Sequence, residues 1–308
     1  MRAFITGVGG QDGSFLAEFL LEKGYEVYGL VRPGGFHQKR NLKKVLDNPD
    51  FHLILGDIMD PYVTNDIASR DLDEIYHLAA AGHVGKSFDA PTTTFQINTI
   101  STLNLLEALR KNNCKARLFF AGSGDCLAGE GKARVGESYP RKAYSPYGVS
   151  KLAALEMCEV YRKAYGMFIS CGLLFPHESS RRDPDFFTRK VCLGLKHPPV
   201  RLGNLDAIKD WHHAKDTVRG EWLSLQQSDP GTYIFASGVG RSLREFIQLA
   251  CDYQGIKLNG NILESGIAPR PLDIPHLVGD PKLAKLALGW EPQISFEEII
   301  QDLSKETP

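Results

Sequence analysis

The sequence predicts a doubly wound α/β fold, in which helices cover both faces of a parallel sheet. Up to about residue 175, short apolar runs rich in β-branched and aromatic residues alternate with longer segments of helical periodicity. Strands of this length separated by helices are typical of a parallel sheet that is buried on both faces. The first apolar run ends in a glycine-rich turn, and 308 residues suffice for one large α/β unit or two closely joined lobes.

The expected elements follow in regular order along the chain. We expect strands at residues 2–7, 25–32, 51–58, 74–80, 117–124 and 168–175, and helices at 11–24, 97–113 and 146–166. After residue 175 the chain is rich in Arg, Lys, Asp and Pro and has weak periodicity through residue 211. A helix at 212–227 and a strand at 232–237 are expected to return to the sheet. We therefore predict a first domain of residues 1–175, joined by segments near 210–237, and a smaller, interleaved C-terminal lobe within 176–308.

Composition narrows the possible partners and compartments. A net charge of −1 and a pI near 6.8 predict no general attraction to nucleic acid or to a membrane surface. The N-terminus leads straight into a strand without a charged leader, and the apolar runs are too short to span a bilayer, so we expect a cytoplasmic protein. The six cysteines show no CxxC spacing, which argues against a zinc site, any other metal centre or a disulfide framework.

A glycine motif after the first strand predicts a dinucleotide site. Gly7, Gly10 and Gly13 have the spacing GxxGxxG between residues 2–7 and the helix at 11–24. Glycines at these positions allow a tight turn, close approach of a pyrophosphate and close helix packing, and the helix N-terminus attracts phosphate. An ordinary strand–helix turn is the alternative, but the position after the first strand favours a Rossmann-type cofactor site. We expect Gln11 and Asp12, which lie within the motif, to belong to it.

Arg32 suggests which dinucleotide is bound. It ends the expected strand 25–32, at the position where enzymes that prefer NAD usually carry an acidic residue for the ribose hydroxyls. A cation there suits the 2′-phosphate of NADP, so NADP is predicted and NAD stays possible. A solvated surface arginine is the alternative.

Two further strand ends are expected to contact the cofactor. Asp57 and Ile58 end the third strand, where they would flank an adenine or form an ordinary turn. Small and apolar residues follow the fourth strand and would let the nicotinamide ribose approach: Leu78, Ala79 and Ala80.

The helix at 146–166 carries a candidate acid/base pair. Ser145 can cap this helix and Pro146 suits its first turn. Tyr147 and Lys151 are four residues apart and share one helical face, so a nearby ammonium is expected to lower the pKa of the phenol. A phenol tuned in this way can take a proton from a sugar hydroxyl. A half-buried tyrosine and a lysine with a solvated head group are the alternative.

These motifs, together with longer segments, resemble a known family. HESSRRD, LGNLDAIKDWHHAKD and GDPKLAKLALGW are similar to segments of the extended short-chain dehydrogenase/reductases, also called the NAD-dependent epimerase/dehydratase family. Within that family the resemblance to GDP-mannose 4,6-dehydratases runs nearly from end to end. It implies a hydro-lyase that converts GDP-mannose or a related GDP-sugar to a 4-keto-6-deoxy product, and assembly as a homodimer or homotetramer.

The resemblance also implies roles for individual residues. Tyr147, helped by Ser123 and Lys151, would assist oxidation at carbon 4, and a carboxylate would remove the proton on carbon 5 as water leaves carbon 6. His177 and Arg182 would contact the cofactor. The residues expected to bind the nucleotide sugar are Ser87, Ser123, Arg182, Arg189, Lys190, Gly203, Asn204, Lys209 and Arg270. For each cation, a solvated surface charge is the alternative.

The chain departs from the family pattern around the sugar and the base. Asp125 stands where the family has a glutamate, in a loop one residue longer, and Pro176 replaces an expected asparagine. The segment after Arg32 is shorter than in the family. The residues after Arg270-Pro271 also differ from the acidic residues that the family usually has there. We hypothesise that Asp125 is the carbon 5 base, with a turn-capping aspartate as the alternative.

Two other functions stay open at this stage. Related epimerases place a cysteine near the position of the dehydratase acid, so Cys126 suggests a GDP-sugar epimerase, and a C4 dehydrogenase or a 4-ketoreductase is chemically close. A catalytically silent NADP-binding regulator belongs to a different class. The presence of Ser123, Tyr147 and Lys151 argues against the regulator.

Overall fold

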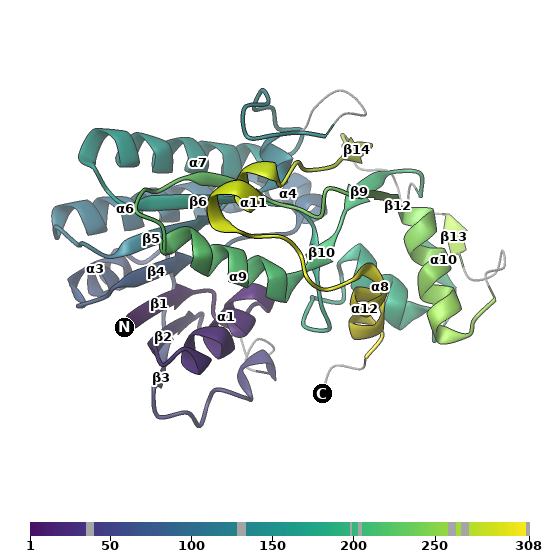
Figure 1. The fold of residues 1–308 in the computed structure, drawn as a ribbon, viewed down its shortest axis with the longest axis horizontal. Coiled ribbons are helices and arrows are strands. Elements are labelled where there is room, and N and C mark those ends of the chain that lie inside the picture. Colours follow the sequence, from purple (N-terminus) through teal and green to yellow (C-terminus); the bar gives the residue numbers. More distant parts are fainter. Residues whose placement is uncertain are drawn as a thin grey trace.

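A seven-stranded parallel sheet forms the centre of the molecule (Figure 1). The computed structural model describes residues 1–34, 40–127, 134–197, 199–202, 205–257, 263–265 and 271–305. The sheet contains β1 (Arg2–Thr6), β2 (Glu26–Val31), β3 (Phe51–Leu55), β4 (Glu74–His77), β5 (Arg117–Ala121), β6 (Ile169–Leu174) and β11 (Thr232–Phe235). Their order is β11-β6-β5-β4-β1-β2-β3, and every neighbouring pair is parallel. Because the chain winds outward in both directions from β1, strand order reverses between β1 and β4.

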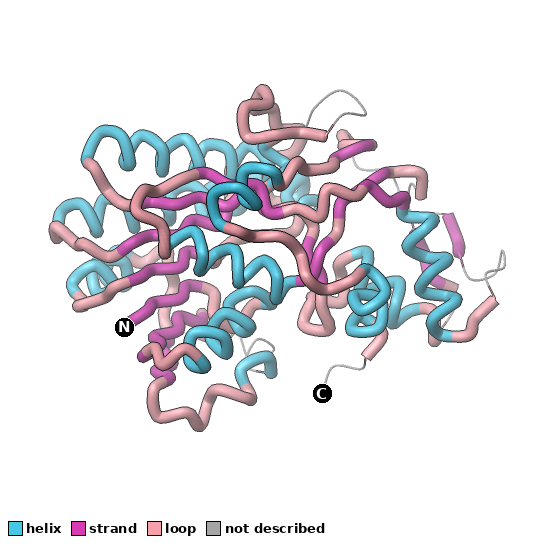
Figure 2. The backbone as a smooth tube through the Cα atoms, viewed as in Figure 1, coloured by secondary structure: helices cyan, strands magenta, loops and turns pink. Residues whose placement is uncertain are grey.

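Helices cover both faces of the sheet (Figures 1 and 2). One face carries α3 (Pro61–Ser69), α6 (Ser101–Lys111) and α7 (Pro146–Tyr165), and the other carries α1 (Gln11–Glu22), α9 (Ala214–Leu225) and α11 (Lys282–Leu288). Short elements lie between them: η1 (Arg40–Leu42), α4 (Val84–Asp89), α5 (Pro91–Phe95), the π-helical turn η2 (Gln96–Ile100) and the 3₁₀ turn η3 (Gly124–Cys126).

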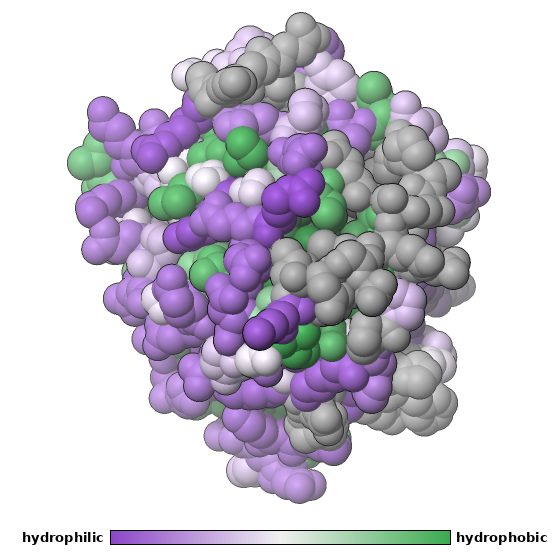
Figure 3. All heavy atoms as spheres, turned by 90° about the vertical axis from the view of Figure 1, so that its right-hand side faces the viewer, coloured by the Kyte–Doolittle hydropathy of each residue, from purple (hydrophilic) through white to green (hydrophobic). Residues whose placement is uncertain are grey.

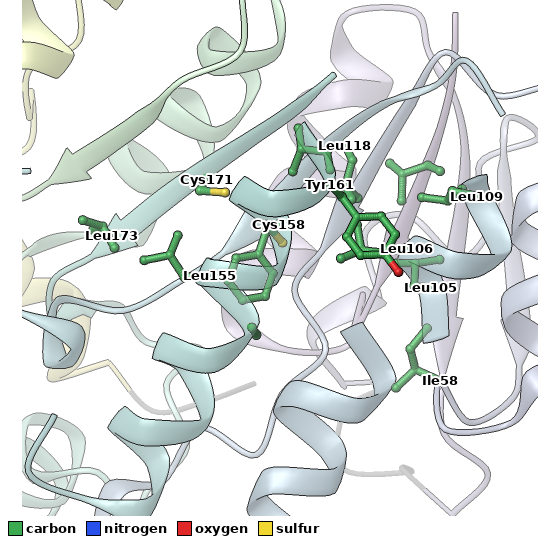
Figure 4. Packing of buried hydrophobic residues seen from close by; sticks show 14 of the residues in the cluster. Ile58, Leu105, Leu106, Leu109, Leu118, Leu155, Cys158, Tyr161, Cys171 and Leu173 are labelled. Carbon is green, nitrogen blue, oxygen red and sulfur yellow. The ribbon is translucent and has the colours of Figure 1, made fainter. Parts of the chain in front are cut away.

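The central strands are buried on both faces, as their apolar sequences require. Figure 4 shows part of the core between the sheet and α6 and α7, where Tyr161 of α7 lies between Leu105 of α6 and Cys158 of α7 within one apolar cluster. Removing such side chains from water contributes about 25 cal/mol for each Å² of apolar area. All six cysteines are free thiols, and most of them are fully buried, as expected for small core residues.

The helix that bears Tyr147 begins and ends where its sequence predicts. The hydroxyl of Ser145 accepts a hydrogen bond from the backbone N–H of Gly148 at 3.0 Å, and Pro146 is the first helical residue. Gly166 ends α7 with φ of 63°, a left-handed conformation that glycine adopts without strain. Local signals therefore define both ends of α7 and fix where its first turn lies against the sheet.

A smaller lobe contains most of the remaining elements. It is built from β8 (Val200–Leu202), β9 (Ile208–Asp210), β12 (Gly240–Ser242), β13 (Leu263–Ser265) and β14 (His276–Leu277), with helices α8 (Phe187–Gly194), α10 (Leu243–Gln254) and α12 (Phe296–Leu303). Apolar side chains of α8, α10 and α12 pack with Trp211 into a separate core. Figure 3 views this lobe's side of the molecule, where hydrophilic residues surround scattered apolar ones.

The chain passes between sheet and lobe several times. Strands β7 (His177–Glu178) and β10 (His212–His213) pair in parallel at the junction, and the chain then returns through α9 to β11 at the edge of the main sheet. After the lobe strands, α11 packs again on α9 and β11, and Trp290 donates a hydrogen bond from its indole N–H to the carbonyl of Asp216 at 2.7 Å. Both lobes therefore share the C-terminal part of the chain.

The fold class predicted from the sequence is confirmed, since a parallel sheet is covered by helices on both faces. The return of residues 232–235 to that sheet agrees with the expected interleaving. The boundary between two domains near residue 175 stays a prediction. Within the described ranges, each helix is too short or too polar to traverse a bilayer.

Gly220 tests how tightly the interleaved segments pack. A Cβ atom at this position of α9 would lie 2.5 Å from the ring of Phe235 and 2.9 Å from the indole nitrogen of Trp290. We expect Gly220→Ala to lower the free energy of unfolding by about 1–3 kcal/mol, because a well-packed core has no room for an added methyl group. Urea denaturation measures the change. Gly136→Ala is the matched control, since a Cβ there meets no atom within 4 Å; equal losses in both variants would contradict tight packing at α9.

Candidate active site

The candidate site lies along one edge of the sheet, at the carboxyl ends of its parallel strands. The turn after β1, the end of β2, the loop after β4 and the turn after β5 all meet this edge, because neighbouring parallel strands end on the same side. Strand order reverses between β1 and β4. In open α/β sheets, ligands bind in the crevice at such a reversal.

The glycine turn after β1 fits a close approach of phosphate to backbone. Gly7 has φ of 73°, and a Cβ there would lie 2.9 Å from the Cα of Ala79. A Cβ at Gly13 would lie 2.6 Å from the carbonyl oxygen of Gly7 and 2.6 Å from the Cα of Val8. Side chains at these glycines would thus collide with backbone atoms, and α1 begins directly after Gly10. The turn therefore leaves the N-terminus of α1 open to an anion.

A buried polar network joins this turn to the loop after β4. The hydroxyl of Thr6 accepts hydrogen bonds from the backbone N–H groups of Leu78 and Ala79, each at 3.1 Å, and lies 2.9 Å from Nδ1 of His77. Burial lowers the pKa of His77 to about 3, and the charge of Lys151 acts in the same direction. His77 is therefore neutral, and the network fixes the residues predicted to face the nicotinamide ribose.

Asn98 is a site residue that the sequence analysis missed. Its side-chain oxygen accepts from the N–H of Ala81 at 2.8 Å, and its amide donates to the hydroxyl of Ser150 at 2.9 Å. Asn98 thus connects the loop after β4 to α7 from within the π-helical turn η2. An asparagine inside an amphipathic helical segment belongs to no short motif, so the sequence offered no signal for this role.

The structure brings Ser123, Tyr147 and Ser87 together. Ser123 follows β5 and forms a side-chain hydrogen bond with Tyr147, which lies in the first turn of α7. The hydroxyl of Ser87 accepts from the backbone N–H of Tyr147 at 3.1 Å and donates to the carbonyl of Val84. The side chain of Tyr147 is therefore held at the end of β5, and its backbone is held against α4.

The pKa of Tyr147 differs from the sequence-based expectation. Burial raises it well above the ordinary value, the charge of Asp125 raises it further, and the hydrogen bond from Ser123 acts in the opposite direction. The ammonium of Lys151 donates instead to the carbonyl of Ala121 at 2.7 Å, and burial lowers the pKa of Lys151 to about 8. The expected lowering of the Tyr147 pKa by Lys151 is therefore wrong for this state of the protein, because burial dominates.

Asp125 and Cys126 are adjacent but differ in environment. Asp125 is half-buried in η3, its backbone N–H donates to the hydroxyl of Ser123 at 3.2 Å, and its charge acts on the phenol of Tyr147. Cys126 is fully buried, with its Sγ 3.8 Å from the carbonyl of Gly148. Burial raises the pKa of the Cys126 thiol to about 12, and Asp125 adds to the shift. Of the two residues, Asp125 is thus the more accessible.

Residues 177–182 connect α1 to the small lobe. His177 lies 2.8 Å from Asp12 through Nε2, and Gln11 donates to the carbonyl of His177 at 3.0 Å. Ser179 donates to the side-chain oxygen of Gln11 at 2.7 Å. The guanidinium of Arg182 lies 3.7 Å from the centre of the Phe186 ring, and its charge influences both Asp12 and Tyr147. Gln11, Asp12, His177 and Arg182 thus form one group beside the glycine turn.

The other predicted cofactor residues lie along the same edge. Arg32 is exposed directly after β2, whose Leu30 carbonyl accepts from the N–H groups of Gly7 and Val8. Asp57 accepts from the N–H of Met59 at 2.9 Å, as in the strand-end turn considered as an alternative. The side chain of Ile58 packs into the core, and a contact of this residue with an adenine stays a prediction. Ala80 is exposed in the loop after β4.

The predicted substrate cations have different surroundings. Arg189 is fully buried, and its guanidinium donates to the carbonyls of Leu303 and Lys305 at the end of α12. The structure thus contradicts the expected diphosphate contact for Arg189, because its donors serve backbone carbonyls in the interior. Lys190 is half-buried in α8, and Lys209 donates to the carbonyl of Ile274 at 2.7 Å. Gly203, Asn204 and Arg270 lie outside the described residues.

Nearly the whole chain is similar in sequence to proteins of one family. The family model for GDP-mannose 4,6 dehydratase matches residues 4–303. A GDP-mannose 4,6-dehydratase of Vibrio cholerae is 36% identical, with 98% of this chain and 92% of that protein aligned. The human GDP-mannose 4,6 dehydratase is 34% identical, with 98% and 90% aligned, and Arabidopsis thaliana GDP-mannose 4,6 dehydratase 1 is 36% identical, with 99% and 89% aligned.

Solved structures share the fold over the whole chain. UDP-glucose 4-epimerase of Thermus thermophilus, in complex with NAD, has a TM-score of 0.87 at 27% identity and covers 100% of this chain and 99% of its own. The dTDP-glucose 4,6-dehydratase DesIV of Streptomyces venezuelae, also with NAD, has a TM-score of 0.90 at 22% identity and covers 98% and 96%. With a full-length family match and relatives above 30% identity, this chain belongs to the GDP-mannose 4,6-dehydratase family.

Proposed function

We propose that this protein is a nicotinamide-dependent GDP-mannose 4,6-dehydratase, a hydro-lyase that forms a 4-keto-6-deoxy sugar nucleotide. The grouping of Ser123, Asp125 and Tyr147 at the carboxyl edge of the sheet, beside the glycine turn, is the observation that carries the proposal. The GDP-mannose 4,6-dehydratase relatives support the substrate class. Assembly as a homodimer or homotetramer and a cytoplasmic location stay predictions.

In the proposed mechanism, Tyr147 takes the proton of the carbon 4 hydroxyl while Ser123 holds that hydroxyl through its own hydrogen bond. A nicotinamide dinucleotide held at the glycine turn would supply the hydride acceptor for carbon 4 and the hydride donor for carbon 6. Tyr147 must be deprotonated to act, so the cationic charge of Arg182 and the hydrogen bond from Ser123, which both lower its pKa, favour the reaction. Lys151 fixes the end of β5 through the Ala121 carbonyl.

We assign the elimination step to Asp125. Once carbon 4 is a ketone, the proton on carbon 5 is acidic, and a carboxylate can remove it as water leaves carbon 6. Asp125 is half-buried and its charge acts on Tyr147, which supports a position near the sugar. Cys126 is fully buried with a thiol pKa raised to about 12, which argues against the epimerase alternative in which this cysteine is the base.

Incubation with GDP-mannose and NADP tests the function. We expect a product that has lost one water, detected by mass spectrometry. Tyr147→Phe should reduce the rate by a factor on the order of 10²–10⁴, since only the ionisable oxygen is removed, while dinucleotide binding is retained. Unchanged mass with exchange of solvent deuterium into the sugar would instead indicate an epimerase. Near-normal turnover of the Tyr147 variant would refute the assignment of the catalytic acid/base.

The Asp125→Asn variant separates oxidation from elimination. It keeps the size of the side chain and removes its basicity, so we expect reduced nicotinamide to accumulate, seen by its near-ultraviolet absorbance, while dehydrated product is lost. Cys126→Ser is the neighbouring control and should retain most activity, because the buried thiol faces the backbone of α7. An inactive cysteine variant together with an active Asp125→Asn would assign the base to Cys126.

Arg32 determines the preferred dinucleotide in this proposal. It is exposed where β2 ends beside the glycine turn, so its guanidinium can reach a phosphate on the adenosine ribose. We expect Arg32→Ala to weaken NADP binding by about 10- to 100-fold, as for a lost charge-assisted hydrogen bond, and to leave NAD affinity nearly unchanged. Fluorescence titration with the reduced dinucleotides measures both. Equal losses for the two would show that Arg32 does not contact the 2′-phosphate.

A further inference from the structure

Both ring nitrogens of His177 face groups that accept hydrogen bonds. Nδ1 lies 2.7 Å from the carbonyl oxygen of Phe175, and Nε2 lies 2.8 Å from Oδ2 of Asp12. A carbonyl oxygen and an ionised carboxylate have no hydrogen to donate, so both nitrogens of His177 must carry one. His177 is therefore an imidazolium, paired with the Asp12 carboxylate.

The other buried histidines in the described residues have different partners. Nδ1 of His213 accepts from the backbone N–H of Lys215 at 3.0 Å, and Nε2 lies 3.3 Å from Asp302. A ring with a single hydrogen, on Nε2, can make both contacts. His77 lies between two threonine hydroxyls, which can donate or accept. Burial lowers the pKa of His212 well below its ordinary value. His177 is thus the one of these four histidines whose two ring nitrogens both face groups that can only accept hydrogen bonds.

Among the charged groups around Asp12, His177 is the main counter-ion of its carboxylate. Burial opposes the charged form of each partner, yet the pKa of Asp12 is lowered and that of His177 is raised, because their mutual attraction and the other hydrogen bonds and charges around them together outweigh burial. Arg182 adds a second positive charge near Asp12. On α9, Glu221 is fully buried; burial and the Asp12 charge raise its pKa well above the usual range, so it stays neutral. His212, whose ring centre is 5.7 Å from that of His177, is neutral as well.

Asp12 occupies an unfavourable place for a carboxylate if phosphate binds there. It lies in the first turn of α1, directly after the glycine turn. A helix N-terminus attracts anions, so an ionised Asp12 and a pyrophosphate would compete for the same positive end of the helix and repel each other. A positive partner for Asp12 removes that repulsion.

We propose that His177 is a positioning residue that neutralises Asp12 and thereby allows α1 to bind the dinucleotide pyrophosphate with an affinity that depends on pH. The inference rests on the dinucleotide binding of the proposed function and assigns His177 a role through charge. Gln11, which donates to the His177 carbonyl and accepts from Ser179, fixes His177 at the required distance.

The direction of the pH dependence follows from the pair. Because the pKa of His177 is raised in the folded protein, the imidazolium is fully present below the ordinary histidine pKa of 6.5 and is lost as the pH rises through the raised value. Asp12, whose pKa is lowered, stays ionised throughout that range. Alkaline pH therefore leaves the charge of Asp12 beside the phosphate site with only Arg182 to offset it.

The test compares dissociation constants of reduced NADP, measured by fluorescence between pH 6 and 9. We expect the affinity of the unaltered protein to fall about tenfold as His177 loses its proton, which corresponds to about 1.4 kcal/mol. At pH 6, His177→Gln should bind about tenfold more weakly than the unaltered protein. Its affinity should not change over this pH range and should equal that of the unaltered protein once His177 has lost its proton. Adding Asp12→Asn to that variant should restore affinity to within about threefold, because the repelling charge is gone.

His213→Asn is the matched control, since it alters the other buried His–Asp pair and keeps a side chain that can cap α9. It should retain both the affinity and its pH dependence. If the double variant binds as weakly as His177→Gln alone, His177 acts through its contacts and the charge-balancing role is overturned.

Nitrogen-15 NMR of the histidine side chains provides a measurement that needs no ligand. We expect both ring nitrogens of His177 to be protonated at pH 7, and Asp12→Asn to shift that signal towards the neutral form. A neutral His177 at pH 7 would overturn the inference. Absence of GDP-mannose dehydration with these binding and NMR results intact would overturn the proposed activity and leave the role of His177 standing.

Discussion

The polar contacts between α1 and residues 177–182 are the constraint on which the site depends. Gln11 and Asp12 at the start of α1 bind the backbone and side chains of His177 and Ser179. Further along, Arg181 donates to Ser14 at 3.0 Å and its guanidinium covers the ring of Phe15 at 3.9 Å. Because the same short segment leads into α8, α1 and the small lobe are held in one geometry.

Burial, more than any single cation, sets the electrostatics of this geometry. It raises the pKa of Tyr147 and of Cys126 and lowers that of Lys151. A phenol kept protonated in this way gives up its proton only when positive charge gathers around it, and Arg182 and a bound nicotinamide ring are such charges. In the proposed mechanism, a bound nicotinamide ring would add its positive charge to that of Arg182 and favour the ionised phenol of Tyr147.

Local patterns predicted the parts of the molecule that local forces determine. The alternation of strands and helices, the glycine turn and the Ser145 cap all depend on neighbours within a few residues, and all are found where they were expected. Arg189 could not be placed in this way, because its partners are carbonyls at the end of a helix more than a hundred residues later. The same holds for Asn98 and for the pairing of Asp12 with His177, which only the tertiary fold creates.

The position of β11 has a consequence for how the chain is made. The sheet acquires this edge strand only after the first half of the small lobe has been synthesised, and Trp290 closes over the same region later still. During translation, the edge of β6 and the surface of α9 therefore stay partly exposed until the residues that cover them have left the ribosome. Contacts between such distant parts of a chain form slowly and expose apolar surface meanwhile. Newly made chains are therefore most in need of chaperone protection in the interval before the C-terminal segment arrives.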